Sequence, residues 1–218
     1  MRHLLLSILL VCSFSLYAKG PVNRGHGYVD LGLSVRWATC NLGASSPEKA
    51  GSYYAWGETQ LKDSCTVWNY RWCEGFFWNL RFTKYGEVDS RVVLESSDDA
   101  ATAAWGGKWR TPTHEELEEL RTGCNWTWYD NYKGSGVCGY LVESKLAGYK
   151  GRSIFLPAAG DKLGTTVRSS GIRGYYMSST IVPGHDHGAC SLLFEKGSAD
   201  WMYCYRYYGQ SVRPVLAR

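Results

Sequence analysis

The sequence predicts an α+β fold in which a strand and two short helices are followed by several short strands. Apolar and polar residues alternate from Val29 to Trp37, and a period of two indicates a half-buried strand. Helix-start signals follow at residues 96–99 and at Thr113. After Cys124, short apolar runs are separated by glycines, which is typical of strands joined by tight turns.

Composition places the chain among globular proteins. Of its 218 residues, 44% are hydrophobic, and it contains 10 Trp, 16 Tyr and 6 Phe. This apolar content excludes an intrinsically disordered chain, and the length suits a single domain. The formal net charge is only +4, without a basic stripe of the kind that binds nucleic acid. We therefore expect no nucleic-acid partner.

The first 18 residues have the pattern of a secretory signal peptide. Arg2 provides a basic start, residues 4–16 are almost all apolar, and Ala18 is a small residue suited to cleavage. We place the cleavage after Ala18, which leaves residues 19–218 as one mature domain. This predicts a secreted protein or one of the cell envelope, in the periplasm or on the outer surface.

A lipid-modified Cys12 is the weaker alternative, because Val11 stands where lipoprotein signals place a small residue. No later apolar run is long enough to span a bilayer, so we expect no transmembrane segment in the mature chain. Removal of residues 1–18 takes Cys12 away and leaves an odd number of cysteines. At least one thiol is therefore unpaired within the chain.

Two helices are predicted in the middle of the chain. Residues 96–99 offer capping side chains before an alanine-rich run at 100–105, which Gly106 then ends. Thr113 and Glu116 have the spacing of a capping box at the start of the second helix. The inward face of that helix is expected to carry Leu117, Leu120 and Cys124.

Residues 59–92 show no clean period but are rich in large aromatic side chains. Packing of these rings under a long loop is the favoured interpretation, and an exposed aromatic platform is the alternative. The aromatic residues are Trp68, Tyr70, Trp72, Phe76, Phe77, Trp78, Phe82 and Tyr85.

A β-hairpin is predicted near the C-terminus, with strands at 191–194 and 200–203. If the hairpin is centred on Gly197, Cys190 lies opposite Cys204. Facing residues in a non-hydrogen-bonded pair have Cα atoms about 4.5 Å apart, which is within disulfide reach. We therefore predict a Cys190–Cys204 disulfide, which an exported protein would form in an oxidising compartment.

Five sequence blocks in order resemble the Fibrobacter succinogenes major paralogous domain, a family common in exported Bacteroidetes proteins. The resemblance runs from about Gly27 to Val215. The blocks are YVDLGLSVRWATCNLGA at 28–44, YYAWGET at 53–59, WGGKWRTPT at 105–113, IFLPAAG at 154–160 and GQSVRPV at 209–215.

The resemblance implies a C-type-lectin-like fold, because the family is similar to a wider group with that fold. This group includes formylglycine-generating enzymes and the variable proteins of diversity-generating retroelements. The implied domain has two helices, a small twisted antiparallel sheet, long loops and termini that lie close together. It does not imply one function, since the fold hosts unrelated activities.

The main functional hypothesis is a non-catalytic binding protein that recognises extracellular protein or glycan through a C-terminal aromatic surface. Tyr, Trp and Arg dominate binding hot spots because they combine rigid contact area with hydrogen-bonding tips. His185 and His187, in a predicted loop, are expected to lie beside these aromatic residues. A metal site at the two histidines would lack a third ligand, so we expect neither a metal nor a cofactor. The candidate ligand-binding residues are Trp201, Tyr203, Tyr205, Arg206, Tyr207 and Tyr208.

Three alternatives remain open. The chain resembles retroelement-diversified ligand-binding proteins in its tyrosine-rich C-terminus, and a neighbouring reverse-transcriptase gene would decide that case. A structural component of a surface assembly would instead bind a protein from its own cell. A formylglycine-generating-type oxidase would need a reactive cysteine pair that holds copper, for which Cys190 and Cys204 are the candidates. Because the flanking residues depart from the enzyme's pattern, we do not expect an enzyme.

Overall fold

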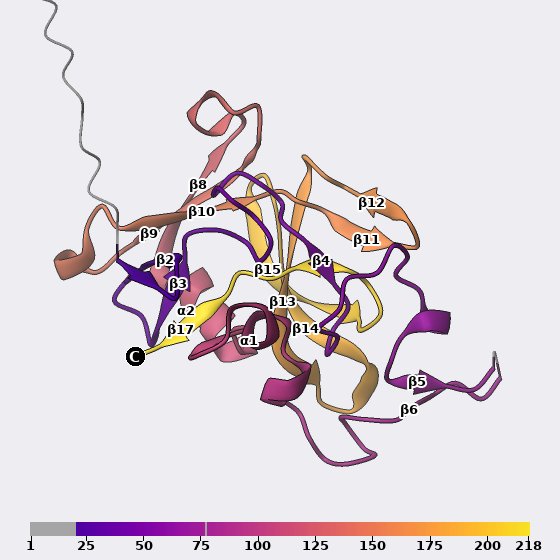
Figure 1. The fold of residues 1–218 in the computed structure, drawn as a ribbon. Helices are drawn as coiled ribbons and strands as arrows, with labels where there is room; N and C mark the ends of the chain where they lie inside the picture. The colour runs from indigo at the N-terminus through magenta and orange to yellow at the C-terminus, as the bar shows by residue number, and fades with distance from the viewer. Residues whose placement is uncertain (1–20, 77) are drawn as a thin grey trace, which may run out of the picture.

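The computed structural model describes residues 21–76 and 78–218 (Figure 1). The predicted signal peptide, its cleavage point after Ala18 and the alternative lipid site at Cys12 lie outside the described residues. Within these ranges, two α-helices accompany mostly antiparallel strands, which is compatible with the predicted α+β class. None of the helices in the described ranges combines the length and apolar character needed to cross a membrane.

One five-stranded sheet joins the two ends of the described chain. In spatial order it contains β1 (Val22–Asn23), β2 (His26–Val29), β3 (Val35–Ala38), β17 (Val215–Ala217) and β7 (Trp109–Arg110). The C-terminal strand β17 pairs antiparallel with β3 and with β7. The N-terminal strands therefore lie close to the C-terminus, as Figure 1 shows.

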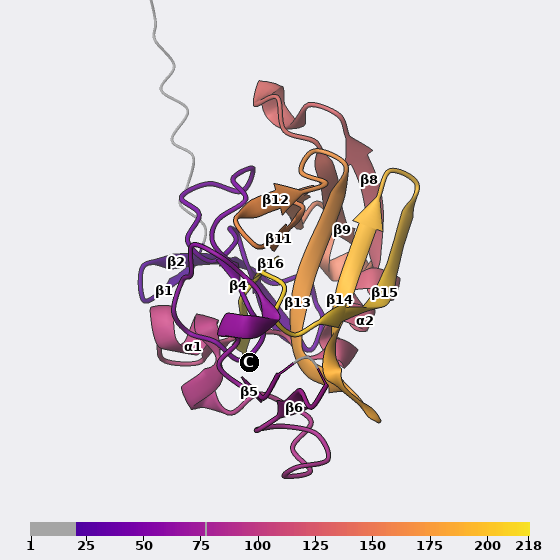
Figure 2. The same ribbon diagram turned by 90° about the vertical axis from the view of Figure 1, so that its right-hand side faces the viewer.

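A second five-stranded sheet carries the longest strands. In spatial order it contains β15 (Ser198–Tyr205), β14 (His185–Glu195), β13 (Arg173–Val182), β16 (Gln210–Ser211) and β4 (Tyr53–Tyr54). Strands β13, β14 and β15 are antiparallel neighbours, whereas β16 pairs parallel to β13. Because β15 is the last strand in this order, it forms one edge of the sheet (Figure 2).

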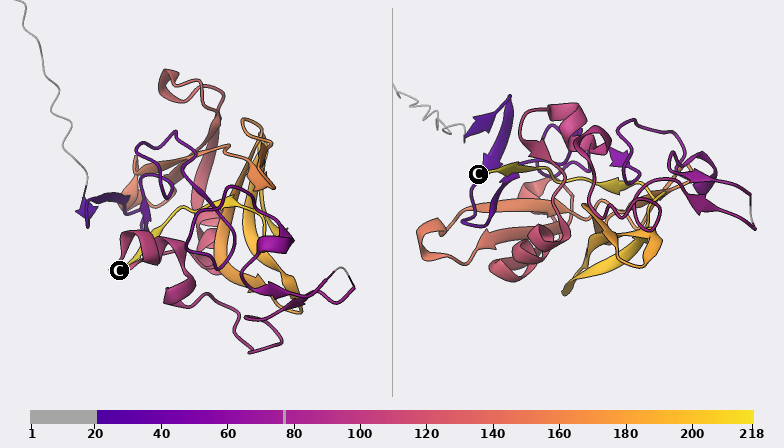
Figure 3. Two further views of the ribbon diagram at one scale, coloured as in Figure 1. Left: turned by 45° about the vertical axis from the view of Figure 1, so that its right-hand side comes forward. Right: turned by 90° about the horizontal axis from the view of Figure 1, so that it is seen from below.

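Three smaller sheets complete the fold. A three-stranded sheet contains β10 (Ser153–Pro157), β9 (Gly139–Ser144) and β8 (Cys124–Tyr129). Strand β11 (Asp161–Leu163) pairs with β12 (Thr166–Arg168), and β5 (Cys73–Glu74) pairs with β6 (Arg81–Phe82). The β5–β6 hairpin projects from one end of the domain (Figure 3). Short 3-10 helices span Val67–Asn69, Ser96–Asp98, Tyr132–Gly134 and Ala147–Tyr149.

The first helix, α1 (Ala100–Trp105), begins and ends as its sequence predicts. The Asp99 carboxylate accepts a hydrogen bond from the Thr102 backbone N–H at 2.9 Å. This N-cap satisfies one of the amides that have no partner inside the helix. Gly106 follows the helix with a φ of +64°, a conformation that glycine adopts without a steric cost.

The second helix, α2 (His114–Gly123), has the predicted capping box, and Leu117 and Leu120 of its predicted inward face are buried, whereas Cys124 begins strand β8. Thr113 Oγ1 accepts the Glu116 N–H at 3.3 Å, and a Glu116 carboxylate oxygen accepts the Thr113 N–H at 2.9 Å. Arg110 also donates to the Glu116 carboxylate at 2.7 Å. The apolar face of α2 enters the main core, whose buried members include Leu31, Leu33, Trp37, Leu117, Leu120, Cys124 and Phe194.

The strand predicted from Val29 to Trp37 is instead a hairpin. Its ends belong to β2 and β3, which pair antiparallel with Val29 opposite Trp37. Gly32 turns the chain with a φ of +82°, and the Asp30 carboxylate accepts the Gly32 N–H at 2.9 Å. The alternating leucines between the strands are still buried, so the period of two correctly predicted burial but not a continuous strand.

The β14–β15 hairpin is confirmed, but its register differs from the prediction by one residue. The turn contains two residues and is not centred on Gly197, so Cys190 faces Tyr203 and Cys204 faces Ala189. A shift of one residue moves a side chain to the other face of a strand, and the two thiols therefore lie on opposite faces. All seven cysteines of the described residues are free. The predicted Cys190–Cys204 disulfide is thus not formed.

Removal of the Thr113 hydroxyl tests the contribution of the capping box. We expect Thr113→Ala to lower the free energy of unfolding by about 1 kcal/mol, because the Glu116 N–H loses its acceptor. Urea-induced unfolding followed by circular dichroism measures this change. Thr113→Ser keeps the hydroxyl and should retain most of the stability. An equal loss in both variants would contradict a capping role.

Candidate binding surface

Six aromatic side chains near one end of β14 and β15 form a continuous series of ring contacts. The rings of His187 and Tyr203 have centroids 5.4 Å apart, and Tyr205 stacks on Tyr207 at 5.4 Å with an interplanar angle of 20°. Tyr207 and Tyr208 meet edge-to-face at 5.0 Å. We call this cluster the aromatic surface. Its members are His185, His187, Tyr203, Tyr205, Tyr207 and Tyr208.

The aromatic surface is open to water on one side. His185 and His187 are exposed, and 41% of Tyr205 is accessible. Tyr203, Tyr207 and Tyr208 are half-buried. The rings therefore support one another laterally while part of each remains available to a ligand. Six of the eight predicted site residues come together in this way.

Trp201, a seventh predicted residue, lies on β15 but makes a different contact. It is 50% exposed, and its ring meets His114 of α2 at 5.8 Å between centroids. In the β14–β15 register it is opposite Leu192, whereas Tyr203 is opposite Cys190. Trp201 thus extends the exposed row of β15 toward α2.

The position of Tyr203 depends on a glycine in the neighbouring strand. A Cβ built at Gly188 would lie 2.0 Å from a carbon of the Tyr203 ring, so the ring occupies the space above this glycine. The Tyr203 hydroxyl is buried and has no hydrogen-bond partner among the described residues. Removal from water also raises the pKa of Tyr203 to about 12, which keeps the hydroxyl protonated.

The two histidines lie on β14 and not in the predicted loop. They alternate with Asp186, whose carboxylate accepts the Glu87 backbone N–H at 2.9 Å. A Cβ at Gly86 would come within 2.0 Å of the Asp186 carboxylate, so this approach requires glycine. Asp186 therefore connects the start of β14 to the aromatic-rich segment 59–92.

Arg206 is buried, which contradicts its prediction as a surface binding residue. Its Nε donates to the Tyr70 hydroxyl at 3.0 Å, and its two terminal nitrogens donate to the backbone oxygens of Asp186 at 2.9 Å and Lys84 at 2.8 Å. The guanidinium also lies 4.8 Å from the ring centroids of both Trp56 and Phe82. Arg206 therefore supports the aromatic surface from inside the protein.

Segment 59–92 uses its aromatic residues in two ways. Tyr70 and Tyr85 are buried beside Arg206, as the packing interpretation predicts. Trp68, Phe76 and Trp78 are exposed, with 93% of Trp78 accessible. Phe77 lies outside the described residues.

Lys84 and Tyr85 anchor segment 59–92 to the 3-10 helix Ser96–Asp98, which precedes α1. Tyr85 donates its hydroxyl hydrogen to Asp98 at 2.6 Å, and the Lys84 ammonium donates to the same carboxylate at 2.5 Å. Burial alone would raise the pKa of Asp98, but these two donors outweigh it and hold the pKa below its ordinary value. The ionised carboxylate therefore fixes the chain next to the Arg206 contacts.

Arg168 of β12 supports the far end of the aromatic surface. Its guanidinium carbon lies 4.7 Å from the centroid of the Tyr208 ring. The same guanidinium forms an ion pair with the buried Asp161 of β11. Tyr208 is consequently held by a cation–π contact whose charged partner is itself fixed.

The described residues contain no group of three or more His, Cys, Asp or Glu side chains arranged to hold a metal ion. His185 and His187 have ring centroids 6.2 Å apart. Cys190 and Cys204 are both buried, and burial raises the pKa of each thiol, to about 11 for Cys190.

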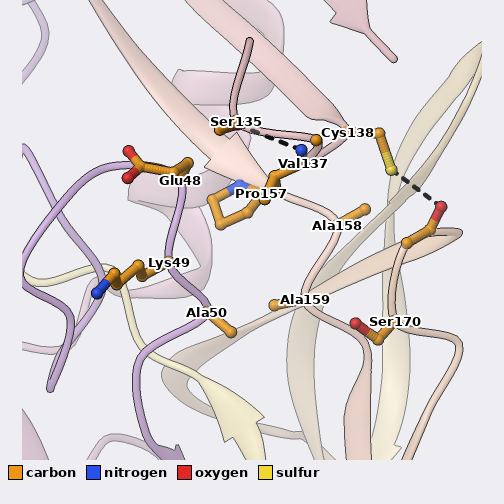
Figure 4. A pocket seen from close by; sticks show the side chains of 12 residues that line it. Glu48, Lys49, Ala50, Ser135, Val137, Cys138, Pro157, Ala158, Ala159 and Ser170 are labelled. Carbon is orange, nitrogen blue, oxygen red and sulfur yellow. Dashed lines mark hydrogen bonds between the residues drawn. The ribbon is translucent and has the colours of Figure 1, made fainter. Parts of the chain in front are cut away.

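A separate cavity of about 490 Å³ lies between loops elsewhere in the domain (Figure 4). Its wall includes Pro157, and the charged groups of Glu48 and Lys49 point away from that proline. The Cys138 thiol donates to the Gly171 carbonyl at 2.9 Å, and burial raises its pKa. No member of the aromatic surface lines this cavity.

No family model, curated protein or solved structure matches the chain. The chemistry of the aromatic surface and the contacts beneath it therefore carry the functional argument.

Replacement of Arg206 tests its supporting role. Arg206→Ala would leave the buried Tyr70 hydroxyl and two partly buried carbonyl oxygens without their donor, so we expect a loss of about 3 kcal/mol in unfolding free energy. Urea-induced unfolding measures the loss. The control is Arg81→Ala, which removes a strongly exposed ion pair with Glu74 and should cost less than about 1 kcal/mol. Similar losses in the two variants would show that Arg206 is not a structural centre.

Proposed function

We propose that this chain is an exported, non-catalytic binding protein that recognises a protein or glycan ligand through the aromatic surface. The observation that carries the proposal is the series of ring contacts from His185 to Tyr208, which is open to water along one side. The signal-like residues 1–18 support export. A C-type-lectin-like fold and membership of the paralogous-domain family are part of the same proposal.

Ordered aromatic rings favour binding because few rotamers have to be fixed when a ligand arrives. Here the stacking of Tyr205 on Tyr207 and the seating of Tyr203 over Gly188 already restrict the side chains. The exposed imidazoles of His185 and His187 add groups that donate and accept hydrogen bonds. Such a surface offers apolar faces with polar tips, which suits peptide side chains and sugar rings.

The supports beneath the surface strengthen this proposal. Arg206 and Asp186 hold the backbone, and the partly exposed Arg168 holds the Tyr208 ring, through contacts that do not need a ligand. A surface that is rigid before binding loses less entropy on binding than a flexible one.

The proposal is tested by a double variant on an array of glycans and extracellular proteins. Tyr205→Ala combined with Tyr207→Ala removes one stacked pair, and we expect at least about a tenfold loss of binding to any ligand of the wild-type protein. Tyr129→Ala, which changes a tyrosine that is 38% exposed on β8, should leave binding unchanged. Full binding by a correctly folded double variant would place the site elsewhere.

A further inference from the structure

Strand β15 has no neighbouring strand on one side of its backbone. Its partner β14 lies on the other side, and β15 ends the strand order of its sheet. In an antiparallel hairpin with a two-residue turn, the residues next to the turn form a hydrogen-bonded pair, and such pairs recur at every second residue. Since Glu195 pairs with Ser198, the backbone groups of Ala199, Trp201 and Tyr203 point toward the free edge.

The hydrogen bonds near this edge agree with that assignment. The Trp201 N–H is not used in the hairpin ladder and is instead accepted by the Asp200 carboxylate at 2.8 Å. The Tyr205 carbonyl also points outward and accepts the Tyr208 N–H at 3.0 Å. For the backbone N–H groups of Ala199 and Tyr203, the described residues provide no acceptor.

We propose that the free edge of β15 binds an extended segment of another protein by adding it as a further strand. This inference rests on the proposed function, because it names the ligand class of the aromatic surface. The outward backbone groups that remain unpaired, among them the N–H groups of Ala199 and Tyr203, are complementary to an extended peptide backbone. The free edge is directly continuous with the aromatic surface, since Tyr203 and Tyr205 belong to β15.

The side chains of β15 indicate what the added segment carries. On one face, Trp201, Tyr203 and Tyr205 form a row at every second residue, and aromatic or β-branched side chains pair well with such rings across strands. On the other face, the exposed Asp200 carboxylate favours a lysine or arginine opposite it. We therefore expect an extended segment in which apolar residues alternate with polar ones that include a cation.

A second copy of this chain fits the edge less well than a different protein. Between Ser198 and Tyr205 the only charged residue is Asp200, so two β15 edges paired with each other offer no cation to this carboxylate. The nearest cation before the strand, Lys196, lies in the hairpin turn and pairs with Asp130 at 2.9 Å, and the next cation after it, Arg206, is buried.

The inference is tested by selecting phage-displayed random peptides that bind the immobilised mature protein. Ala199→Pro removes an outward backbone N–H and so prevents an added strand from pairing there. An edge strand tolerates proline at such a position, because the N–H that is lost faces solvent. Ala199→Ser is the matched control that keeps the N–H. We expect the peptides selected on the wild type to bind the Ser variant normally and the Pro variant at least about tenfold more weakly.

A second measurement uses the selected peptides and remains informative if the Pro variant fails to fold. Synthetic peptides are methylated on the backbone nitrogen at alternate positions. Methylation of the residues that face β15 should reduce affinity by at least about tenfold, and methylation of the intervening residues should have little effect. Equal tolerance at all positions, or no enrichment of any peptide, would overturn the inference.

Two further outcomes separate this inference from the proposed function. Ligands that need Tyr205 and Tyr207 but bind the Pro variant normally would overturn strand addition and leave the aromatic surface as the binding site. A wild-type dimer in sedimentation that Ala199→Pro dissociates would show that the edge binds a second copy, against the partner proposed here.

Discussion

The candidate site depends on the hydrogen bonds of the buried Arg206 guanidinium. This group donates hydrogen bonds to Tyr70, to Lys84 and to Asp186, and these residues come from two segments far apart in the chain. The charged guanidinium contacts neutral oxygen atoms and aromatic rings, and these contacts replace the water that would otherwise solvate it. Because both segments meet at one side chain, the long aromatic-rich segment and the histidine end of β14 are fixed together.

A second buried arginine uses the same chemistry elsewhere in the fold. Arg213 donates to the Asn41 side chain at 2.8 Å and to the backbone oxygens of Ala38, Thr39 and Phe155. Burial lowers the pKa of Arg213, but its donors are all directed at oxygen atoms. The C-terminal part of the chain is thus held in place at two points where the domain has little regular secondary structure. Rigid loops of this kind suit a surface that binds ligands without a large change of shape.

Local signals in the sequence predicted both helices and the β14–β15 hairpin but not the long-range placement of these elements. The capping box at Thr113 needs only four neighbouring residues, and it was confirmed. The hairpin register was wrong because a turn of two residues and a turn of three are equally compatible with the apolar pattern. Arg206 was predicted at the surface since its partner Tyr70 is remote in sequence, and no local pattern shows a buried cation. The rings of the aromatic surface were predicted from composition, whereas their mutual contacts depend on Gly188 in the adjacent strand.

The central claim is that Arg206 fixes the segment 66–86 and the aromatic surface as one unit. Hydrogen–deuterium exchange of Arg206→Lys tests it directly, because lysine keeps the charge but cannot reach three oxygens in one plane. We predict faster exchange in residues 66–86 and in residues 203–209 together, with α2 and β8–β10 unchanged. Faster exchange confined to residues 203–209 would contradict the claim.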